Sequence, residues 1–285
     1  MSRTNSRPPE QTQGDVGLHR VLELKAYDEP SLFSPENLLR EARRQKALPD
    51  VPVPEVALLD PDGDIVRHLI GTGAGRRHPG WACYHTDMWV TDLDGIEVGV
   101  VGMAVGAPFA VLVAEQLAAS GARLVISITS AGVITPTRKP PYFVLIDRAL
   151  RDEGTSGHYL PSATWSELPE RVVSQLDGAY DGLIEPVDRG SSWTTDAPYR
   201  ETASTVAAAQ EAGIACVEME AAALYAYAAA RARDVVCIAH LTNTMATLGD
   251  DFEKGNGNGV PAALAIVRAT IAALSMEPSP RERTN

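Results

Sequence analysis

Hydrophobic positions along the chain alternate between short β-rich runs and longer helical runs. The short runs have the composition of buried strands: GIEVGVVGM (95–103), ARLVISIT (122–129), YFVLIDRAL (142–150) and DVVCIAHLTN (234–243). The longer runs are rich in alanine and leucine: PFAVLVAEQLAASG (108–121), EAAALYAYAAARA (220–232) and VPAALAIVRATIAALS (260–275). This alternation predicts an α/β layered domain whose sheet is largely parallel.

Weaker patterns fill in the remaining organisation. GLIEPVDRG (182–190) and IACVEM (214–219) are further strand candidates, and VPVPEVALL (51–59) is an extended entry to the main fold. Ser34 followed by Pro35 predicts the N-cap and first turn of a helix through ENLLREARRQKAL. We therefore expect an extension over residues 1–50, with about the first 15 disordered, a main domain over 51–278 and a polar tail over 279–285.

Composition restricts the partners of this domain. The 285 residues include 25 basic and 37 acidic side chains, a net charge of −12, which argues against nucleic-acid or membrane-surface binding. The three cysteines show no metal-ligand spacing, so we expect reduced thiols and no metal site. The N-terminus lacks a signal core and no apolar run reaches membrane-spanning length, so we expect a cytoplasmic protein.

Polar residues follow several predicted strands, where an α/β sheet presents its functional groups. Gly102 and Gly106 lie between a strand and a helix, in a turn that either cradles an anion or only packs the helix on the strand. Thr129 and Ser130 end the 122–129 run, where hydroxyls either bind phosphate and sugar oxygens or cap the strand itself. The residues leave both alternatives open.

Two carboxylates interrupt an apolar run at Val217-Glu218-Met219-Glu220. A favourable charge at a helix N-terminus, worth about 1 kcal/mol or less, explains one glutamate but not two around a methionine. A carboxylate at this junction can accept both hydrogen bonds of a sugar 2′,3′-diol, and a methionine can pack on the furanose. Of all the motifs, this one points most specifically to a ligand.

Two further segments suit recognition of a base. Residues 193–200 (WTTDAPYR) combine aromatic, hydroxyl and charged side chains that either stack on a base or pack at a rim. Residues 240–243 (HLTN) end the last predicted strand, where the asparagine amide either reads a base edge or closes a turn.

Taken in this order, the stretches resemble the nucleoside phosphorylase superfamily over roughly residues 55–275. Residues 63–67 (GDIVR) are similar to the family's GDPxR phosphate loop, RDEGTSGHY (151–159) matches a family loop, and VEMEAAALY (217–225) is the most specific match. The resemblance implies a three-layer α/β/α fold with a central mixed β-sheet. It also implies reversible, phosphate-dependent cleavage of a nucleoside to a free base and a pentose 1-phosphate.

The resemblance assigns site residues to three parts of the substrate, with inorganic phosphate as co-substrate and no cofactor. The ribose residues are Glu218, Met219 and Glu220; the phosphate residues are Gly63, Arg67, Ser127 and Ser130; the base residues are Trp193, Tyr199, Arg200 and Asn243. Catalysis is assigned to Glu220, Asn243 and Arg67. The family also implies a homo-oligomer, a dimer or a hexamer, in which His85 is a candidate for a cross-subunit contact.

Two departures from the family leave alternatives open. Ser127 stands where many phosphorylases carry a phosphate-binding arginine, so a hydrolytic nucleosidase on the same fold is the alternative reaction. Asn243 stands where many purine enzymes carry a proton-donating aspartate, although asparagine occurs in a branch that favours 6-oxopurines, so a purine is slightly favoured. Both losses also suit a non-catalytic nucleoside-binding homologue.

Overall fold

A computed structural model describes residues 24–244 and 252–274 of the chain. The chain divides into two compact units, Met1–Ser31 and Leu32–Asn285. The second unit contains every helix and strand named below. The predicted disorder of the first residues and the polar tail at 279–285 lie outside the described residues.

The strands of the second unit join into one sheet. Their bounds are β1 (Val56–Asp60), β2 (Arg76–Arg77), β3 (Trp89–Leu93), β4 (Ile96–Gly102), β5 (Leu124–Val133), β6 (Tyr142–Asp152), β7 (Trp165–Glu167), β8 (Val187–Thr195), β9 (Cys216–Glu218) and β10 (Asp234–Asn243).

The helices comprise α-helices and short 3-10 turns. The α-helices are α2 (Pro35–Lys46), α3 (Asp64–Thr72), α4 (Ala107–Ala119), α5 (Glu170–Leu176), α6 (Ala203–Glu211), α7 (Ala221–Arg231) and α8 (Val260–Leu274). The 3-10 turns are η1 (Ser156–His158), η2 (Pro198–Arg200) and η3 (Asn256–Gly259).

The sheet is mixed and closes partly on itself. Its strand order is β10-β6-β8-β9-β5-β1-β4-β3-β2, with β7 beside β6. Since β10 pairs with β5 as well as with β6, the strands β5, β10, β6, β8 and β9 form a ring. Parallel pairing joins β4, β1, β5 and β10 in turn, so their carboxyl ends lie at the same edge.

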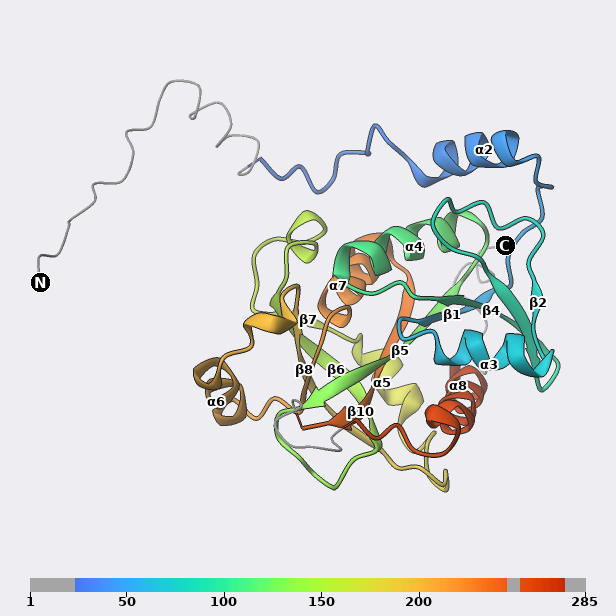
Figure 1. Cartoon of the computed structure of the whole chain (residues 1–285). Coiled ribbons are helices and arrows are strands. Elements are labelled where there is room, and N and C mark those ends of the chain that lie inside the picture. Colours follow the sequence, from blue (N-terminus) through green and yellow to red (C-terminus); the bar gives the residue numbers. More distant parts are fainter. Residues whose placement is uncertain (1–23, 245–251, 275–285) are drawn as a thin grey trace, which may run out of the picture. The chain divides into compact units, whose positions relative to one another are not determined.

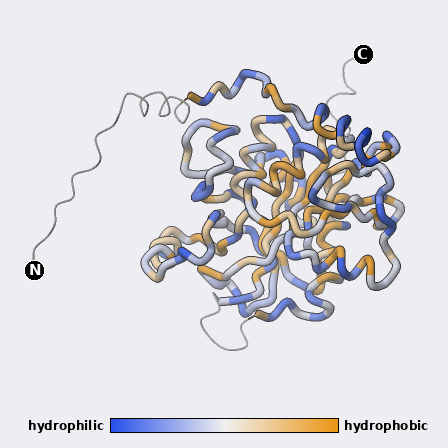
Figure 2. Tube along the Cα trace, turned by 45° about the horizontal axis from the view of Figure 1, so that its top comes forward, coloured by the Kyte–Doolittle hydropathy of each residue, from blue (hydrophilic) through white to orange (hydrophobic). Residues whose placement is uncertain are grey.

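Helices cover both faces of this sheet (Figure 1), which confirms the predicted three-layer α/β/α fold. Helices α4 and α7 pack on each other on one face, with α2 against α4, and α3, α8 and α5 are neighbours on the other. Hydrophobic residues gather in the interior strands, while the outer loops are mostly hydrophilic (Figure 2). The layered core thus fixes the strand ends that carry the polar motifs.

Helix α2 confirms the predicted N-cap, because the Ser34 side chain accepts the Asn37 N–H at 3.3 Å. Leu39 and Ala42 on this helix are buried with Ala82 in a small cluster. Residues 32–50 therefore belong to the compact unit that holds the sheet.

Two local predictions were wrong. The strand expected at 182–190 begins only at Val187, because Pro186 just before it has no N–H to pair, and Ile184 is fully exposed. The stretch Asn256–Leu274 is long and apolar enough to cross a membrane by length and composition, contrary to our expectation. In the fold this stretch is η3 and α8, whose apolar face is buried against the core.

Candidate active site

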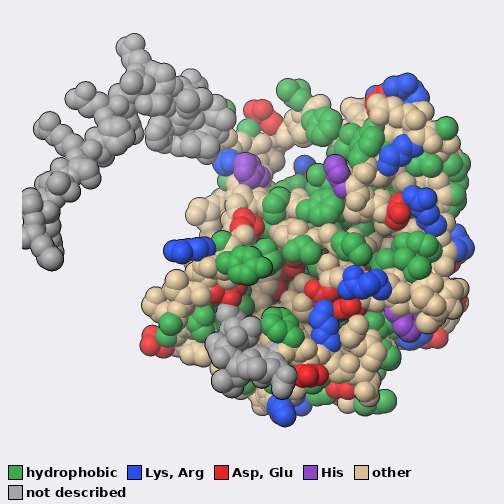
Figure 3. Space-filling model, viewed as in Figure 1, with side chains coloured by type: hydrophobic (Ala, Val, Ile, Leu, Met, Phe, Trp, Pro, Cys, Tyr) green, Lys and Arg blue, Asp and Glu red, His purple; other side chains and the backbone are tan. Residues whose placement is uncertain are grey.

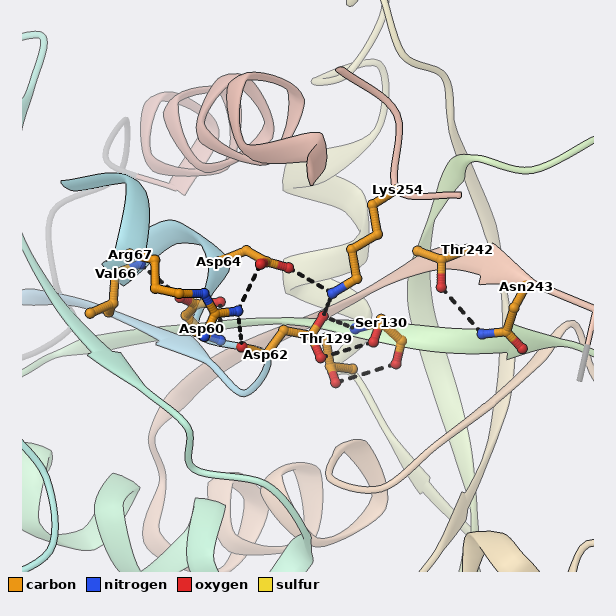
Figure 4. Close-up of polar contacts among 11 residues, drawn as sticks. Asp60, Asp62, Asp64, Val66, Arg67, Thr129, Ser130, Thr242, Asn243 and Lys254 are labelled. Atoms are coloured by element: carbon orange, nitrogen blue, oxygen red, sulfur yellow. Dashed lines mark hydrogen bonds and ion pairs between the residues drawn. The ribbon is translucent and has the colours of Figure 1, made fainter. Parts of the chain in front are cut away.

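The predicted ribose and phosphate motifs lie at the carboxyl ends of β1, β4 and β5 and at the junction of β9 with α7. Asp60 ends β1 opposite Gly102 at the end of β4, and its carbonyl accepts the Met103 N–H at 2.9 Å. Hydrogen bonds connect this edge to the later part of the chain, at Glu220 of the β9–α7 turn and at Lys254 before α8. Figure 4 shows the polar contacts on the β1–β5 side.

Glu218 organises the turn from β9 into α7. Its Oε2 accepts the N–H groups of Glu220 and Ala221, each at 2.7 Å, and thereby caps the start of the alanine-rich helix. Its Oε1 accepts the hydroxyls of Ser192 at 2.9 Å and Thr194 at 2.5 Å from β8. The buried Glu218 carboxylate thus accepts four hydrogen bonds from the protein and holds the turn in place. The direct contact with ribose that we expected for Glu218 stays a prediction.

Glu220 has the opposite arrangement. The carboxylate is 1% exposed, and its Oε1 accepts the Gly106 N–H at the start of α4 at 2.7 Å. Its Oε2 is buried and makes no hydrogen bond of standard geometry to the residues that the structure describes; the nearby Thr129 hydroxyl donates instead to the Ser130 carbonyl at 3.4 Å. Burial, and then the charge of Glu218, raise the pKa of Glu220 to about 8, although the Gly106 N–H and the Thr129 hydroxyl limit the rise. A buried acceptor without a partner is set up to receive donors from a ligand.

Met219 lies between these two glutamates and is half-buried at the turn. Hydrogen bonds hold the residues on both sides of it and thereby fix the backbone of the turn. This placement is compatible with the predicted contact between the methionine and a furanose ring.

The loop after β1 forms the start of α3, and its backbone donors face inwards. Gly63 has a φ of +74°, a left-handed backbone conformation that favours glycine. The Asp60 carboxylate accepts the N–H groups of Gly63 at 3.1 Å and Val66 at 2.9 Å. We expected Gly63 to bind phosphate, but in this structure its N–H donates to the Asp60 carboxylate.

Burial and the nearby carboxylates of Asp62 and Asp64 raise the pKa of Asp60 to about 6, although its two backbone donors oppose the rise. Two cations, Arg67 and Lys254, lie beside these three aspartates and offset part of their charge. The Arg67 Nη2 lies 2.7 Å from Asp64 Oδ1, and Lys254 Nζ lies 2.6 Å from the other oxygen of Asp64.

Ser130 is engaged by the same loop, whereas Ser127 is not at the site. The Ser130 hydroxyl donates to Asp62 Oδ1 at 2.8 Å, and its N–H donates to Oδ2 at 3.2 Å (Figure 4). Ser127 lies three residues earlier in β5, opposite Leu59 and Cys237, and is 1% exposed. Because it lies within the strand and not at its carboxyl end, Ser127 belongs to the core of the sheet; its hydroxyl has no partner among the described residues.

Trp193, which we expected to bind the base, lies in the core of the structure. Its side chain is buried in a cluster with Ile134, Ile214 and Val217, and its indole N–H donates to Asp152 Oδ2 at 2.9 Å. A strand period of two explains this placement, because Trp193 and the Thr194 that faces Glu218 point to opposite faces of β8. The tryptophan is therefore a core residue.

The remaining base-side residues are dispersed. Tyr199 and Arg200 lie on η2 and are exposed, Tyr199 at 99%. Asn243 ends β10 beside Gly132 of β5 and is 8% exposed, with its Nδ2 donating to Thr242 Oγ1 at 3.2 Å. Asn243 is thus the base-side residue that lies beside the strand carrying Thr129 and Ser130 (Figure 4).

His85 is an exposed residue of the segment between β2 and β3. Its ring contacts Phe109 edge-on, with centroids 6.1 Å apart, and Phe109 belongs to the first turn of α4 behind Gly106. The cross-subunit contact of His85 stays a prediction. No group of three or more potential metal ligands occurs among the residues that the structure describes.

Comparison with known proteins decides the family. The family model of the phosphorylase superfamily matches residues 62–272, well over half of the chain. The chain belongs to the phosphorylase superfamily.

Relatives within the superfamily are distant. Guanosine phosphorylase from Halorubrum lacusprofundi is 26% identical over 136 residues, which are 47% of this chain and 56% of that protein. The alignment therefore spans about half the length of this curated relative.

Solved structures of the superfamily share the fold. A purine nucleoside phosphorylase from Toxoplasma gondii, in complex with immucillin-H, has a TM-score of 0.66 at 18% identity and covers 78% of this chain and 92% of its own. A uridine phosphorylase from Vibrio fischeri, complexed with 6-hydroxy-1-naphthoic acid, has a TM-score of 0.64 at 18% identity, with coverages of 79% and 93%.

Sequence reasoning missed two side chains of this candidate site, Asp62 and Lys254. The aspartate was visible as part of a run of three acidic residues at alternate positions, 60, 62 and 64, which overlaps the GDPxR-like motif. The lysine carried no local signal, because its segment lies outside every predicted element and reaches Asp62 only through the tertiary fold.

Proposed function

We propose that this protein is a nucleoside phosphorylase, which uses inorganic phosphate to cleave a nucleoside to a free base and a pentose 1-phosphate. The observation that carries the proposal is the buried Glu220 carboxylate, with one oxygen held by Gly106 and the other without a partner among the described residues. An unpaired buried acceptor is destabilising, and the vicinal hydroxyls of a pentose supply the missing donors. Membership of the phosphorylase superfamily supports a nucleoside as the source of that pentose.

The proposed reaction breaks the C1′–N bond through an oxocarbenium-like state. A phosphate oxygen forms the new bond to C1′, and the departing base takes the bonding electrons and a proton from phosphate or water. Glu220 and Met219 orient the sugar, while Arg67 and Ser130 hold the phosphate. Asn243 contributes hydrogen bonds to the base but cannot protonate it.

We propose a purine as the base. The support is the asparagine at the end of β10, whose amide both donates and accepts, and the similarity to a protein named guanosine phosphorylase. We also propose that the protein forms a homo-oligomer in which His85 reaches the site of a neighbouring subunit. A cytoplasmic location is a further part of the proposal.

The test is a panel of purine and pyrimidine nucleosides incubated with and without inorganic phosphate, with base and sugar products separated by chromatography. We expect base release that requires phosphate and yields pentose 1-phosphate. Glu220→Ala, purified in parallel, controls for contaminating host enzymes. Undiminished base release in phosphate-free buffer, with free pentose as product, would refute the proposal.

Hydrolysis is a second candidate, favoured by one observation. The Asp62 carboxylate accepts the N–H and hydroxyl of Ser130, which are groups expected to hold phosphate. A carboxylate at that place could instead activate a water molecule. The same assay separates the two reactions through the sugar product.

A further inference from the structure

The Asp62 carboxylate lies in a ring of donors that would suit a free anion. Its Oδ1 accepts the Ser130 hydroxyl at 2.8 Å, and its Oδ2 accepts the Ser130 N–H at 3.2 Å and the Lys254 ammonium at 3.0 Å. A backbone N–H, a hydroxyl and a cation are a donor set that proteins use for oxyanions such as phosphate. Here a side chain of the protein satisfies all three.

Lys254 supplies positive charge that β5 lacks. The position expected to carry a phosphate-binding arginine is Ser127, which is buried and uncharged. Lys254 comes from the segment before α8, and its side chain is 24% exposed at the loop after β1. The N–H of the preceding residue, Glu253, donates to the Thr242 carbonyl at 2.9 Å, which fixes this segment against the end of β10.

The charges around this point do not balance while Asp62 stays in place. Asp60, Asp62 and Asp64 face Arg67 and Lys254, so three carboxylates oppose two cations. A phosphate entering beside Asp62 would add further negative charge. If Asp62 leaves, Ser130 and Lys254 are released to the phosphate and the local repulsion falls. Figure 3, viewed as in Figure 1, shows basic and acidic side chains around a hollow near the middle of the molecule.

We propose that Lys254 is a phosphate-binding residue of this enzyme, and that Asp62 competes with phosphate for Lys254 and Ser130. The inference rests on the phosphorolysis proposed above. Lys254, in the segment before α8, would supply the positive charge that an arginine on β5 provides in many phosphorylases. Phosphate affinity would then depend on an internal competitor.

The experiment compares wild type with Lys254→Ala, Lys254→Arg and Asp62→Asn, and uses Lys139→Ala, an exposed lysine in the β5–β6 loop, as the matched control. Steady-state kinetics give separate KM values for phosphate and nucleoside, and calorimetric titration with inorganic phosphate gives its Kd. We expect Lys254→Ala to raise the KM for phosphate about tenfold or more, as loss of a charged hydrogen bond does, and to change the nucleoside KM less than about threefold. Lys254→Arg should restore part of the loss, and Asp62→Asn should lower the Kd for phosphate.

Two results would overturn the inference. One is a Lys254→Ala enzyme whose phosphate KM matches that of the Lys139→Ala control. The other is an Asp62→Asn enzyme that binds phosphate no better than wild type, above all if its turnover is lost, as expected of a carboxylate that activates water. Thermal unfolding of each variant checks that it is folded. Wild-type turnover with and without phosphate tests the proposed function separately, so a phosphate-dependent wild type with an unaffected Lys254 variant would refute only the inference.

Discussion

Replacing Glu220 with glutamine tests the sugar-binding carboxylate most directly. The variant keeps the shape of the side chain and one acceptor for the Gly106 N–H, but it places a neutral amide where Oε2 lies buried without a partner. At pH 9, above the pKa of about 8, the Glu220 carboxylate is charged. Two hydrogen bonds from a ribose diol to this charged acceptor contribute about 1.5–3 kcal/mol each, so their loss amounts to about 3–6 kcal/mol. At about 1.4 kcal/mol per factor of ten, kcat/KM should fall by roughly 10²- to 10⁴-fold.

A substrate series shows whether that loss comes from the diol. The assay measures kcat/KM of wild type and Glu220→Gln on a ribonucleoside and on its 2′,3′-dideoxy counterpart. Wild type should lose most of its activity when the hydroxyls are removed, whereas the variant should lose little more, because the contact is already absent. Glu211→Gln on the exposed end of α6 is the matched control. If the ratio between the two substrates is the same in both enzymes, Glu220 does not bind the diol.

Three further outcomes are expected. Because burial raises the pKa of Glu220 from 4.5 to about 8, the wild-type protein loses stability as pH rises through this range. The free energy of unfolding of Glu220→Gln should therefore exceed that of wild type at pH 9 and approach it near pH 4.5. A difference in urea unfolding that does not vary with pH would contradict this. Trp193→Phe should lower the free energy of unfolding by about 1–3 kcal/mol, through loss of the bond to Asp152, and leave the nucleoside KM within about threefold; a tenfold rise in KM at unchanged Tm would return Trp193 to the base site. Arg67→Ala should raise the KM for phosphate far more than that for nucleoside, and equal effects on the two would remove Arg67 from the phosphate site.

The main elements of the fold could be predicted because the same residues show both the local propensity for a helix or strand and the hydrophobic pattern of burial in a layered core. The run 234–243 has the bounds of β10, since every residue after Asp234 is buried and residues 235–239 form a continuous apolar run. Helix α3 was not predicted as a helix, because its residues were interpreted as a phosphate loop. Its N-cap is Gly63, which has no side chain, and its first N–H groups are accepted by Asp60 of the preceding strand. Short strands such as β2 and β7 carry too few residues for a periodic signal.

The candidate site was predictable where one short motif contains both the ligand-facing group and its support, as at Glu218 and Glu220. It was not predictable where distant segments meet. The contact of Lys254 with Asp62 depends on how the segment before α8 crosses the end of β10, and no local pattern encodes that path. Trp193 shows a third case, since a residue type suited to stacking on a base is equally suited to a core.

The ring closed by β10 has a consequence for how the protein folds. Gly106 must find Glu220 across 114 residues, and Lys254 lies 192 residues beyond Asp62. Contacts of such separation carry a large loop-closure entropy and form slowly. The site therefore exists only after the last strand has joined β5 and β6, and in a refolding experiment enzymatic activity should return later than helical circular dichroism.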